Sequence, residues 1–397
     1  MPTCQQNLAA LKKRAVSWVD EHAAELISLA DEIHSHPELG FAEHRAASLL
    51  THALAEAGFT VMLPYTGLAT AFRAALETPA HGLARPSEEH RESRIKVAFL
   101  AEYDALPGIG HACAHNLSGV ASAGAALALA ELGEDLIGTV VVFGTPAEEG
   151  TVPQAGGKVH LAEAGAFADI DSAMMFHFGD CNVLTTPLLA RESLVLSFHG
   201  RAAHAAGSPE SGLNALDAAV LFFNAVNALR QHLTADVRVH GIISHGGESP
   251  NTIPDFTEVK LNVRAETLAS LTTVVERVRD CARGAALATG TRVEFAQWAK
   301  TYADFIPDRR LLDLLGQNLT ALGVEWEEAG TARFSSDIGT VSHLIPCAHP
   351  YLAIVPRGVP GHSEAFCRAA ASPEGHRAML LAAKALALTA LDIFDSK

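Results

Sequence analysis

The sequence predicts an α/β fold in which a mixed, mostly parallel sheet is interrupted by an inserted ferredoxin-like (βαββαβ) domain. From Ile95 onward short apolar runs alternate with helical segments, as is typical of a parallel sheet covered by helices. From about Arg191 the order becomes β-α-β-β-α-β, the ferredoxin-like split motif, and the first pattern then resumes. We therefore expect a first domain in two parts, 1–189 and 302–397, with the inserted domain at 190–301.

The segments before the inserted domain are expected in the following order. Residues 5–60 have helical periodicity, with a break at His36-Pro37 and an end near Gly58. The polar stretch from Pro79 to Arg94 predicts a surface loop. Strands and helices then alternate at 95–104, 119–132, 139–144, 159–167 and 172–177. Because ligands of such sheets bind beyond the carboxyl ends of the strands, residues directly after each strand are expected to line a site.

The inserted domain is expected to contain four strands and two helices. The strands are expected at 194–200, 237–247, 258–266 and 291–298, and the helices at 214–233 and 268–290. The chain then returns through a helix at 308–322, a loop at 333–339, an apolar run at 351–356 and a final helix at 373–394.

Composition narrows the class of protein. With 29 Lys+Arg against 45 Asp+Glu, the formal net charge is −16 and no basic patch is evident, so nucleic acid is not an expected partner. Neither a run of about 18 uncharged apolar residues nor an apolar leader is evident, which predicts no membrane segment and no membrane partner. The six cysteines lack CxxC spacing, so we expect a reducing, cytoplasmic location.

Two motifs place reactive side chains directly after predicted strands. In HACAH (111–115), an extended loop would let Cys113 and His115 face one cation. Thiolate and imidazole suit zinc, while imidazole with carboxylate broadens the choice toward manganese or cobalt. In PAEEG (146–150), Glu148 and Glu149 are costly after a buried strand unless they are paired, protonated or metal-bound. One carboxylate could bind metal while the other takes a proton from water.

His177, at the end of a predicted strand, and His362, after the run 351–356, complete the pattern. Each feature has an ordinary alternative: a reduced core cysteine beside a capped histidine, a solvated acidic loop, or a structural histidine. The joint pattern favours a site, because four separate strands each deliver a ligand type to the edge where α/β proteins bind ligands.

Six stretches resemble the M20 metallopeptidase family, in particular its D-type amidohydrolase branch of aminoacylases, aminobenzoyl-glutamate hydrolases and β-alanyl-lysine dipeptidases. They occur in the family's order and span nearly the whole chain. The stretches are HSHPELGFAEH (34–44), AEYDALPGIGHACAHN (101–116), GTPAEEG (144–150), GRAAHAA (200–206), SPNTIP (249–254) and GHSEAF (361–366).

The resemblance implies roles for these residues. It implies one or two divalent ions per subunit, Mn²⁺, Zn²⁺ or Co²⁺, with Glu148 as the general base and Asp104 supporting the ligands. The implied metal ligands are Cys113, His115, Glu149, His177 and His362.

The resemblance also makes the inserted domain a lid and dimerisation domain. In it His204 would reach the neighbouring subunit's site to steady an oxyanion, so a homodimer or higher homo-oligomer is expected. Asn251 and Arg264 match positions that hold a substrate carboxylate. Ala114 departs from the usual glycine of HACGH, and Thr340 stands where close relatives have asparagine. These departures touch the pocket but remove no ligand.

We therefore expect a metal-dependent amidohydrolase that cleaves the C–N bond of a small carboxylate-bearing substrate, such as an N-acyl amino acid, an aminoacyl dipeptide or aminobenzoyl-glutamate. Three alternatives remain open. One is an aminohydrolase that releases ammonia from an amino-substituted aromatic acid, and another is a non-catalytic metal-binding protein on the same fold. The third is a cysteine enzyme using Cys113 and His115, for which no third residue to orient the base is evident.

Overall fold

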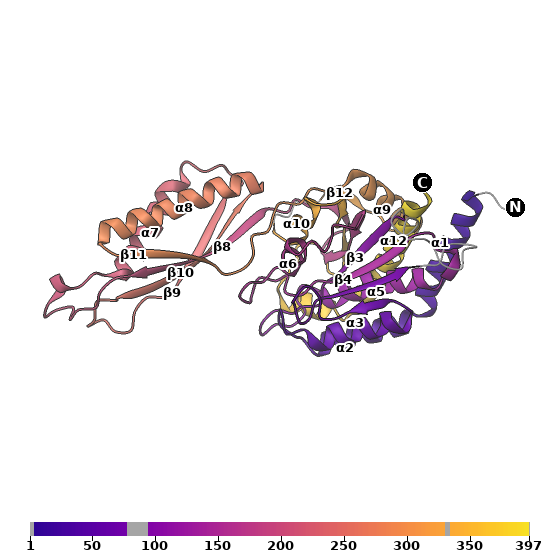
Figure 1. Ribbon diagram of the computed structural model, residues 1–397, viewed down its shortest axis with the longest axis horizontal. Helices are drawn as coiled ribbons and strands as arrows, with labels where there is room; N and C mark the ends of the chain where they lie inside the picture. The colour runs from indigo at the N-terminus through magenta and orange to yellow at the C-terminus, as the bar shows by residue number, and fades with distance from the viewer. Residues whose placement is uncertain (1–3, 78–93, 330–333, 397) are drawn as a thin grey trace. The chain divides into compact units, whose positions relative to one another are not determined.

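The computed structural model describes residues 4–77, 94–329 and 334–396, and these divide into two compact units. The first unit comprises residues 1–187, 306–333 and 340–397, and the second comprises 188–305 and 334–339. The surface loop expected at 79–94 lies, up to residue 93, outside the described residues. Figure 1 shows the path of the chain.

The first unit is built on a six-stranded sheet with the order β1-β2-β4-β3-β5-β13. Strands β3, β4, β5 and β13 are parallel, whereas β1 and β2 pair antiparallel at one edge. The central strands are nearly wholly buried apolar runs, as expected for strands with both faces covered. The bounds are β1 (Thr60–Met62), β2 (Phe72–Glu77), β3 (Lys96–Ala101), β4 (Thr139–Gly144), β5 (Ser172–Met174) and β13 (Cys347–Ala348).

Helix α5 (His115–Ala130) is the central helix of this unit. Every residue from His115 to Leu129 is buried, and the helix packs against β3, α2 and α12. Its small residues, such as Gly119, permit this, because a Cβ at Gly119 would lie 2.5 Å from Glu102 O. The other helices are α1 (Cys4–Glu21), α2 (Ala23–Ser35), α3 (His44–Glu56), α6 (Gly157–Glu163), α9 (Arg309–Ala321), α10 (Ile338–Ser342), α11 (Glu364–Ala369) and α12 (Pro373–Asp395), with a 3₁₀ turn at Gly133–Asp135.

A second, smaller sheet in this unit was not expected from the sequence. Its order is β12-β7-β14-β6, with bounds β6 (His177–Gly179), β7 (Val183–Thr185), β12 (Glu327–Ala329) and β14 (Tyr351–Ala353). The single strand predicted to end at His177 is therefore wrong, because the chain leaves the main sheet after Met174 and His177 begins β6 instead. Strand β6 pairs parallel with β14, and His177 lies opposite Tyr351.

The second unit has the predicted β-α-β-β-α-β order. Its antiparallel sheet runs β11-β8-β10-β9, and helices α7 and α8 pack on β8 and β10. The alternating burial of β10 shows that one sheet face forms the core of this unit. The bounds are β8 (Ala190–His199), α7 (Ala215–Arg230), β9 (Arg238–His245), β10 (Phe256–Ala265), α8 (Leu268–Thr289) and β11 (Arg292–Gln297), with a 3₁₀ turn at Pro209–Ser211.

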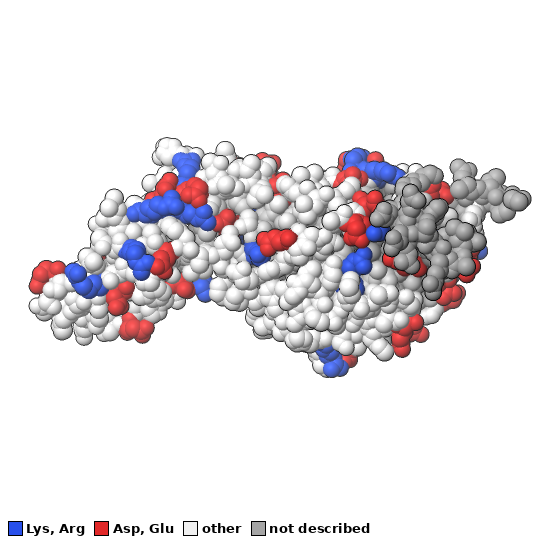
Figure 2. Space-filling model, in the orientation of Figure 1, with Lys and Arg blue, Asp and Glu red and all other residues white. Residues whose placement is uncertain are grey.

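Taken together, the two units confirm the predicted fold class of a mixed, mostly parallel sheet and a separate antiparallel domain. The domain limits expected from the sequence stay a prediction. In the described part of the chain no helix is both long and apolar enough to cross a membrane. On the face shown in Figure 2, the described Lys and Arg side chains stand among Asp and Glu and form no broad basic area.

Gly157, at the start of α6, packs closely against the acidic loop (146–150) that follows β4. A Cβ at this position would lie 2.0 Å from Pro146 O, and the Gly157 N–H donates to the same oxygen at 3.1 Å. We predict that Gly157→Ala lowers the free energy of unfolding by about 1 to 3 kcal/mol, because the added methyl group must displace the loop. The measurement is urea unfolding. As a control, Gly284→Ala in α8 meets no atom within 4 Å and should leave stability unchanged or higher.

Candidate active site

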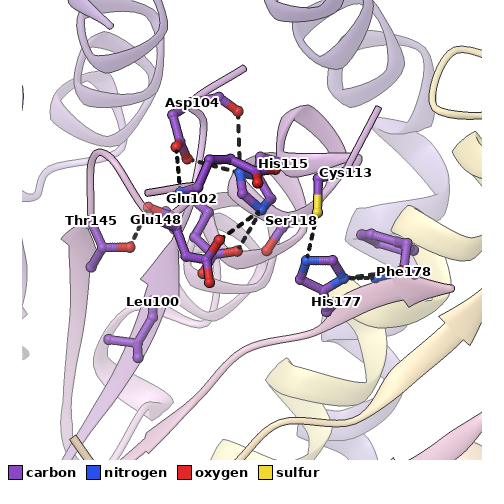
Figure 3. Close-up of polar contacts among 12 residues, drawn as sticks. Leu100, Glu102, Asp104, Cys113, His115, Ser118, Thr145, Glu148, His177 and Phe178 are labelled. Atoms are coloured by element: carbon purple, nitrogen blue, oxygen red, sulfur yellow. Dashed lines mark hydrogen bonds and ion pairs between the residues drawn. The ribbon is translucent and has the colours of Figure 1, made fainter. Parts of the chain in front are cut away.

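The predicted metal ligands lie together at the carboxyl ends of the parallel strands. The predicted ligands and Glu148 form three groups whose ligand atoms lie within 4.8 Å of one another: Cys113 with His115 and His177, Cys113 with Glu149 and His362, and His115 with Glu148 and Glu149. Figure 3 shows His177 beside Cys113, with His115 between these residues and the carboxylates Glu102 and Glu148. All six residues singled out from the sequence therefore meet in one place.

The HACAH segment reaches this place by a turn, so the extended loop expected for it is wrong. Cys113 lies in the turn and His115 is the first residue of α5. Ala114 joins them with φ 58°, in the left-handed region that favours glycine. The backbone N–H of Ala114 closes the turn by donating to His111 O at 3.0 Å. The glycine usual in relatives is thus explained by backbone geometry, and this chain retains the geometry with alanine.

Asp104 orients His115. Its Oδ1 accepts a hydrogen bond from Nδ1 of His115 at 2.8 Å, so Nε2 of the same ring faces the site. The other carboxylate oxygen, Oδ2, accepts from the backbone N–H of Glu149 at 3.1 Å. Burial would lower the pKa of His115, but the carboxylates of Glu102 and Asp104 outweigh burial and raise it. One buried carboxylate therefore positions two segments of the site.

The acidic loop is fixed by a carboxylate that sequence reasoning did not single out. Glu43 is fully buried, and its Oε1 accepts from the backbone N–H of Ala147 at 2.8 Å while its Oε2 accepts from Thr70 Oγ1 at 2.8 Å. Ala147 has φ 56°, another left-handed position. Burial, followed by repulsion from Asp104, raises the pKa of Glu43 to about 7. Burial likewise raises the pKa of Glu149.

A second feature missed from the sequence is a fully buried ion pair. Nζ of Lys158 lies 2.6 Å from Oε1 of Glu102, and both side chains are inaccessible to solvent. The other oxygen of Glu102 faces Nε2 of His115 at 3.4 Å. Burial would raise the pKa of Glu102, but the ammonium group of Lys158, and then His115, lower it further than burial raises it. Glu102 is therefore a carboxylate beside a predicted metal ligand.

The remaining ligand candidates come from three other segments. Nε2 of His177 lies 3.6 Å from Sγ of Cys113, and burial lowers the pKa of His177 to about 4, so the ring is neutral and able to bind metal. Nε2 of His362 lies 3.4 Å from Oε2 of Glu149. Burial, and then the charge of Glu149, raise the pKa of the Cys113 thiol. A thiol in this setting becomes a thiolate only with a cation beside it.

The polar atoms of the site fit a divalent metal. Oε2 of Glu102, Nε2 of His115 and Oε1 of Glu149 are buried and have no hydrogen-bond partner among the described residues. Leaving such atoms unsatisfied costs about 1 to 3 kcal/mol each, so atoms that face one another without donors indicate a bound cation. Sulfur, imidazole and carboxylate ligands together are those of zinc and of neighbouring transition metals.

Comparisons with known proteins find relatives that match nearly the whole chain. The chain is 40% identical to the Xaa-Arg dipeptidase of Homo sapiens over 98% of this chain and 90% of the relative. It is 31% identical to one of the p-aminobenzoyl-glutamate hydrolase polypeptides of Escherichia coli over 92% of this chain and 88% of the relative. The solved structure of the YXEP protein of Bacillus subtilis, described as a dinuclear metal-binding peptidase of the M20 family, has a TM-score of 0.69 at 20% identity and covers 95% of this chain and 100% of its own.

The chain belongs to the M20 peptidase family. Residues 192–289, within the second unit, match the model described as a peptidase dimerisation domain. Because the relatives are named hydrolases of amide bonds, this M20 protein is an amidohydrolase of the peptidase type.

Three residues predicted to serve the site lie in the dimerisation domain. The backbone N–H groups of Gly207 and Ala206 donate to Nδ1 of His204 at 3.0 and 3.3 Å, so the proton of the neutral ring is on Nε2 and the exposed side chain is a hydrogen-bond donor. Asn251 is exposed, and its backbone carbonyl accepts a hydrogen bond from the backbone N–H of Ala205. Arg264, on β10, donates from Nη1 to Ser335 Oγ at 2.8 Å.

We predict that Lys158→Met lowers the free energy of unfolding by about 3 to 5 kcal/mol, because it leaves the carboxylate of Glu102 buried without its cation. The measurement is urea denaturation of the purified variant. The double variant Lys158→Met with Glu102→Gln removes both charges and should recover most of the loss. Equal losses in the single and double variants would show that packing of the lysine, and not its charge, is what matters.

Proposed function

We propose that this M20 protein is a metal-dependent amidohydrolase that cleaves the C–N bond of a small carboxylate-bearing amide. The observation that carries the proposal is the convergence of Cys113, His115, Glu149, His177 and His362 around buried atoms without hydrogen-bond donors. The names of the relatives support an N-acyl amino acid, a dipeptide or an aminobenzoyl-glutamate type of substrate.

The ligand groups suit one or two Mn²⁺ or Zn²⁺ ions, with Co²⁺ as a further candidate. Two of the groups share Cys113, so its thiolate could be a ligand together with His115 and His177, or together with Glu149 and His362. When bound, such ions polarise a carbonyl group and lower the pKa of water. Asp104 holds His115 and the backbone of Glu149 in place for this binding.

Glu148 is the proposed general base. It is buried, and its carboxylate lies 4.0 Å from Nε2 of His115 and close to Glu149. This position lets it take a proton from the attacking water and deliver that proton to the leaving amine. In the dimerisation domain, Nε2 of His204 is placed to donate a hydrogen bond to the oxyanion that develops on the substrate. Arg264 and Asn251 are the residues that we propose hold the substrate's carboxylate.

We further propose a homodimer in which His204 serves the partner subunit. Strand β9 is an edge strand of its sheet and exposes Ile242, while Val220 and Leu221 are exposed on α7. Such edges and apolar patches mark association surfaces, and the match to a dimerisation domain supports this assignment.

We predict that Glu148→Gln keeps the fold and the metal content of the wild type but lowers kcat by about 100- to 10,000-fold, because a carboxamide cannot accept the proton. Circular dichroism, metal analysis and amino-acid release from a panel of amides are the measurements, with the exposed Glu131→Gln as the control.

Treatment with a chelator should abolish turnover, and added Mn²⁺ or Zn²⁺ should restore it. Full turnover by demetallated protein would disprove the metal-dependent mechanism.

The service of His204 to the partner is tested by subunit complementation. Glu148→Gln and His204→Ala homodimers should each be nearly inactive, whereas an equal mixture after subunit exchange should recover about a quarter of wild-type activity, because half of the dimers would have one complete site of two. If His204 acts within its own subunit, the mixture stays as inactive as its components.

A further inference from the structure

Among the described residues, Arg191 at the start of β8 is a buried cation without a counter-charge. The residue is 7% exposed, and its guanidinium lies over the ring of Tyr302, 3.9 Å from the centroid. Its backbone exchanges two hydrogen bonds with Tyr302, at 2.9 Å each. Within the part of the chain that the structure describes, Nε and Nη2 have no hydrogen-bond partner. A buried charge with unsatisfied donors is costly, so this arrangement requires a reason.

A second cation lies next to it. Arg264 on β10 is directly opposite Arg191 on β8, and residues directly opposite in an antiparallel pair point to the same face. This face is opposite to the one that forms the core, since the core residues of β10 are Val259, Leu261, Val263 and Ala265. Like charges directly opposite one another in a sheet repel. Burial, and then the charge of Arg264, lower the pKa of His240 on the adjacent strand, as expected for a positive field.

The chemistry of the two guanidinium groups specifies the ligand. Nε and Nη2 lie along one edge of the guanidinium plane, and two parallel N–H donors on one edge match the two oxygens of a carboxylate. Tyr302 covers one face of the Arg191 plane and so fixes the direction of this edge. Arg264 donates to the Ser335 hydroxyl, and because a guanidinium has several N–H groups it can bind an anion as well. Two cations side by side suit two carboxylates better than one.

We propose that Arg191 and Arg264 together bind the two carboxylates of an acidic amino acid, so that this amidohydrolase releases glutamate or aspartate in preference to a neutral or basic amino acid. The inference rests on the proposed function and names its substrate class. Arg264 takes the α-carboxylate and Arg191 takes the side-chain carboxylate, while a lysyl or arginyl side chain would be repelled at this position. Arg191 is therefore the specificity-determining residue.

The test compares matched amides that differ in the amino acid alone. Two acyl groups, p-aminobenzoyl and β-alanyl, are each joined to glutamate, glutamine or lysine, and kcat and KM are measured with the metal-loaded enzyme. Wild type should prefer the glutamate amide over the glutamine amide by about 10- to 100-fold in kcat/KM, mainly through KM, with the lysine amide poorest. Arg191→Met should bring the glutamate-to-glutamine ratio to within about twofold, and Arg191→Glu should move the preference toward lysine.

Arg292→Met is the matched control. Arg292 lies in the same sheet, opposite His199 at the other end of β8, and its guanidinium is paired with Glu294, so the glutamate-to-glutamine ratio should not change. If the amides are cleaved and Arg191→Met keeps the wild-type ratio, Arg191 only stacks on Tyr302 and the inference is wrong.

Calorimetry separates this inference from the proposed function. Free glutamate should bind the wild-type protein at least about tenfold more tightly than glutamine, a result that needs neither turnover nor a folded Arg191 variant. Absence of cleavage of every amide together with this preference would overturn the hydrolase mechanism and keep the acidic-ligand site. Cleavage together with equal binding of glutamate and glutamine would overturn the acidic-ligand site and keep the hydrolase mechanism.

Discussion

The site depends on the carboxylate of Asp104, which holds two segments of the chain at once. One oxygen fixes the ring of His115, and the other fixes the backbone of Glu149. These segments follow different strands, so without this bridge the ligand atoms would keep the freedom of their loops, and ordering them would cost about 1 to 2 kcal/mol per residue on metal binding. With the bridge, this entropy is lost when the chain folds and not when the metal binds. A preorganised site binds a cation more tightly as a result.

Such preorganisation creates an electrostatic problem that a cation resolves. Glu43, Glu102, Asp104 and Glu148 are all buried, and each pKa shift of Glu43, Cys113 and Glu149 is upward, as expected where negative charge crowds in a medium of low polarity. Lys158 neutralises the charge of Glu102. A divalent ion beside the remaining groups would lower these pKa values together, and for this reason metal binding and correct protonation of the site form one equilibrium.

The ligand set could be predicted from the sequence because residues that follow parallel strands share one edge of a sheet. The local geometry could not: Cys113 and His115 meet through a left-handed turn at Ala114, and His177 begins a strand of a second sheet instead of ending one in the first. Lys158 and Glu102 escaped prediction for a different reason. Their contact joins residues 56 positions apart, and no periodicity links a lysine after a glycine pair to a glutamate at the end of an apolar strand.

Membership of the M20 family therefore says more about the reaction of this chain than about its substrate. The proposed ligands and Glu148 lie in the first unit, and the proposed attack by water needs the same geometry there for every substrate. Arg191 and Arg264 lie in the second unit, and we propose that they select the substrate's amino acid. A relative named for a basic amino acid and one named for glutamate are both similar to this chain over nearly its whole length. Overall identity therefore does not decide between them. The guanidinium of Arg191 is buried and has an edge that is unsatisfied among the described residues, and it supports the proposed acidic amino acid because an anion would offset its desolvation.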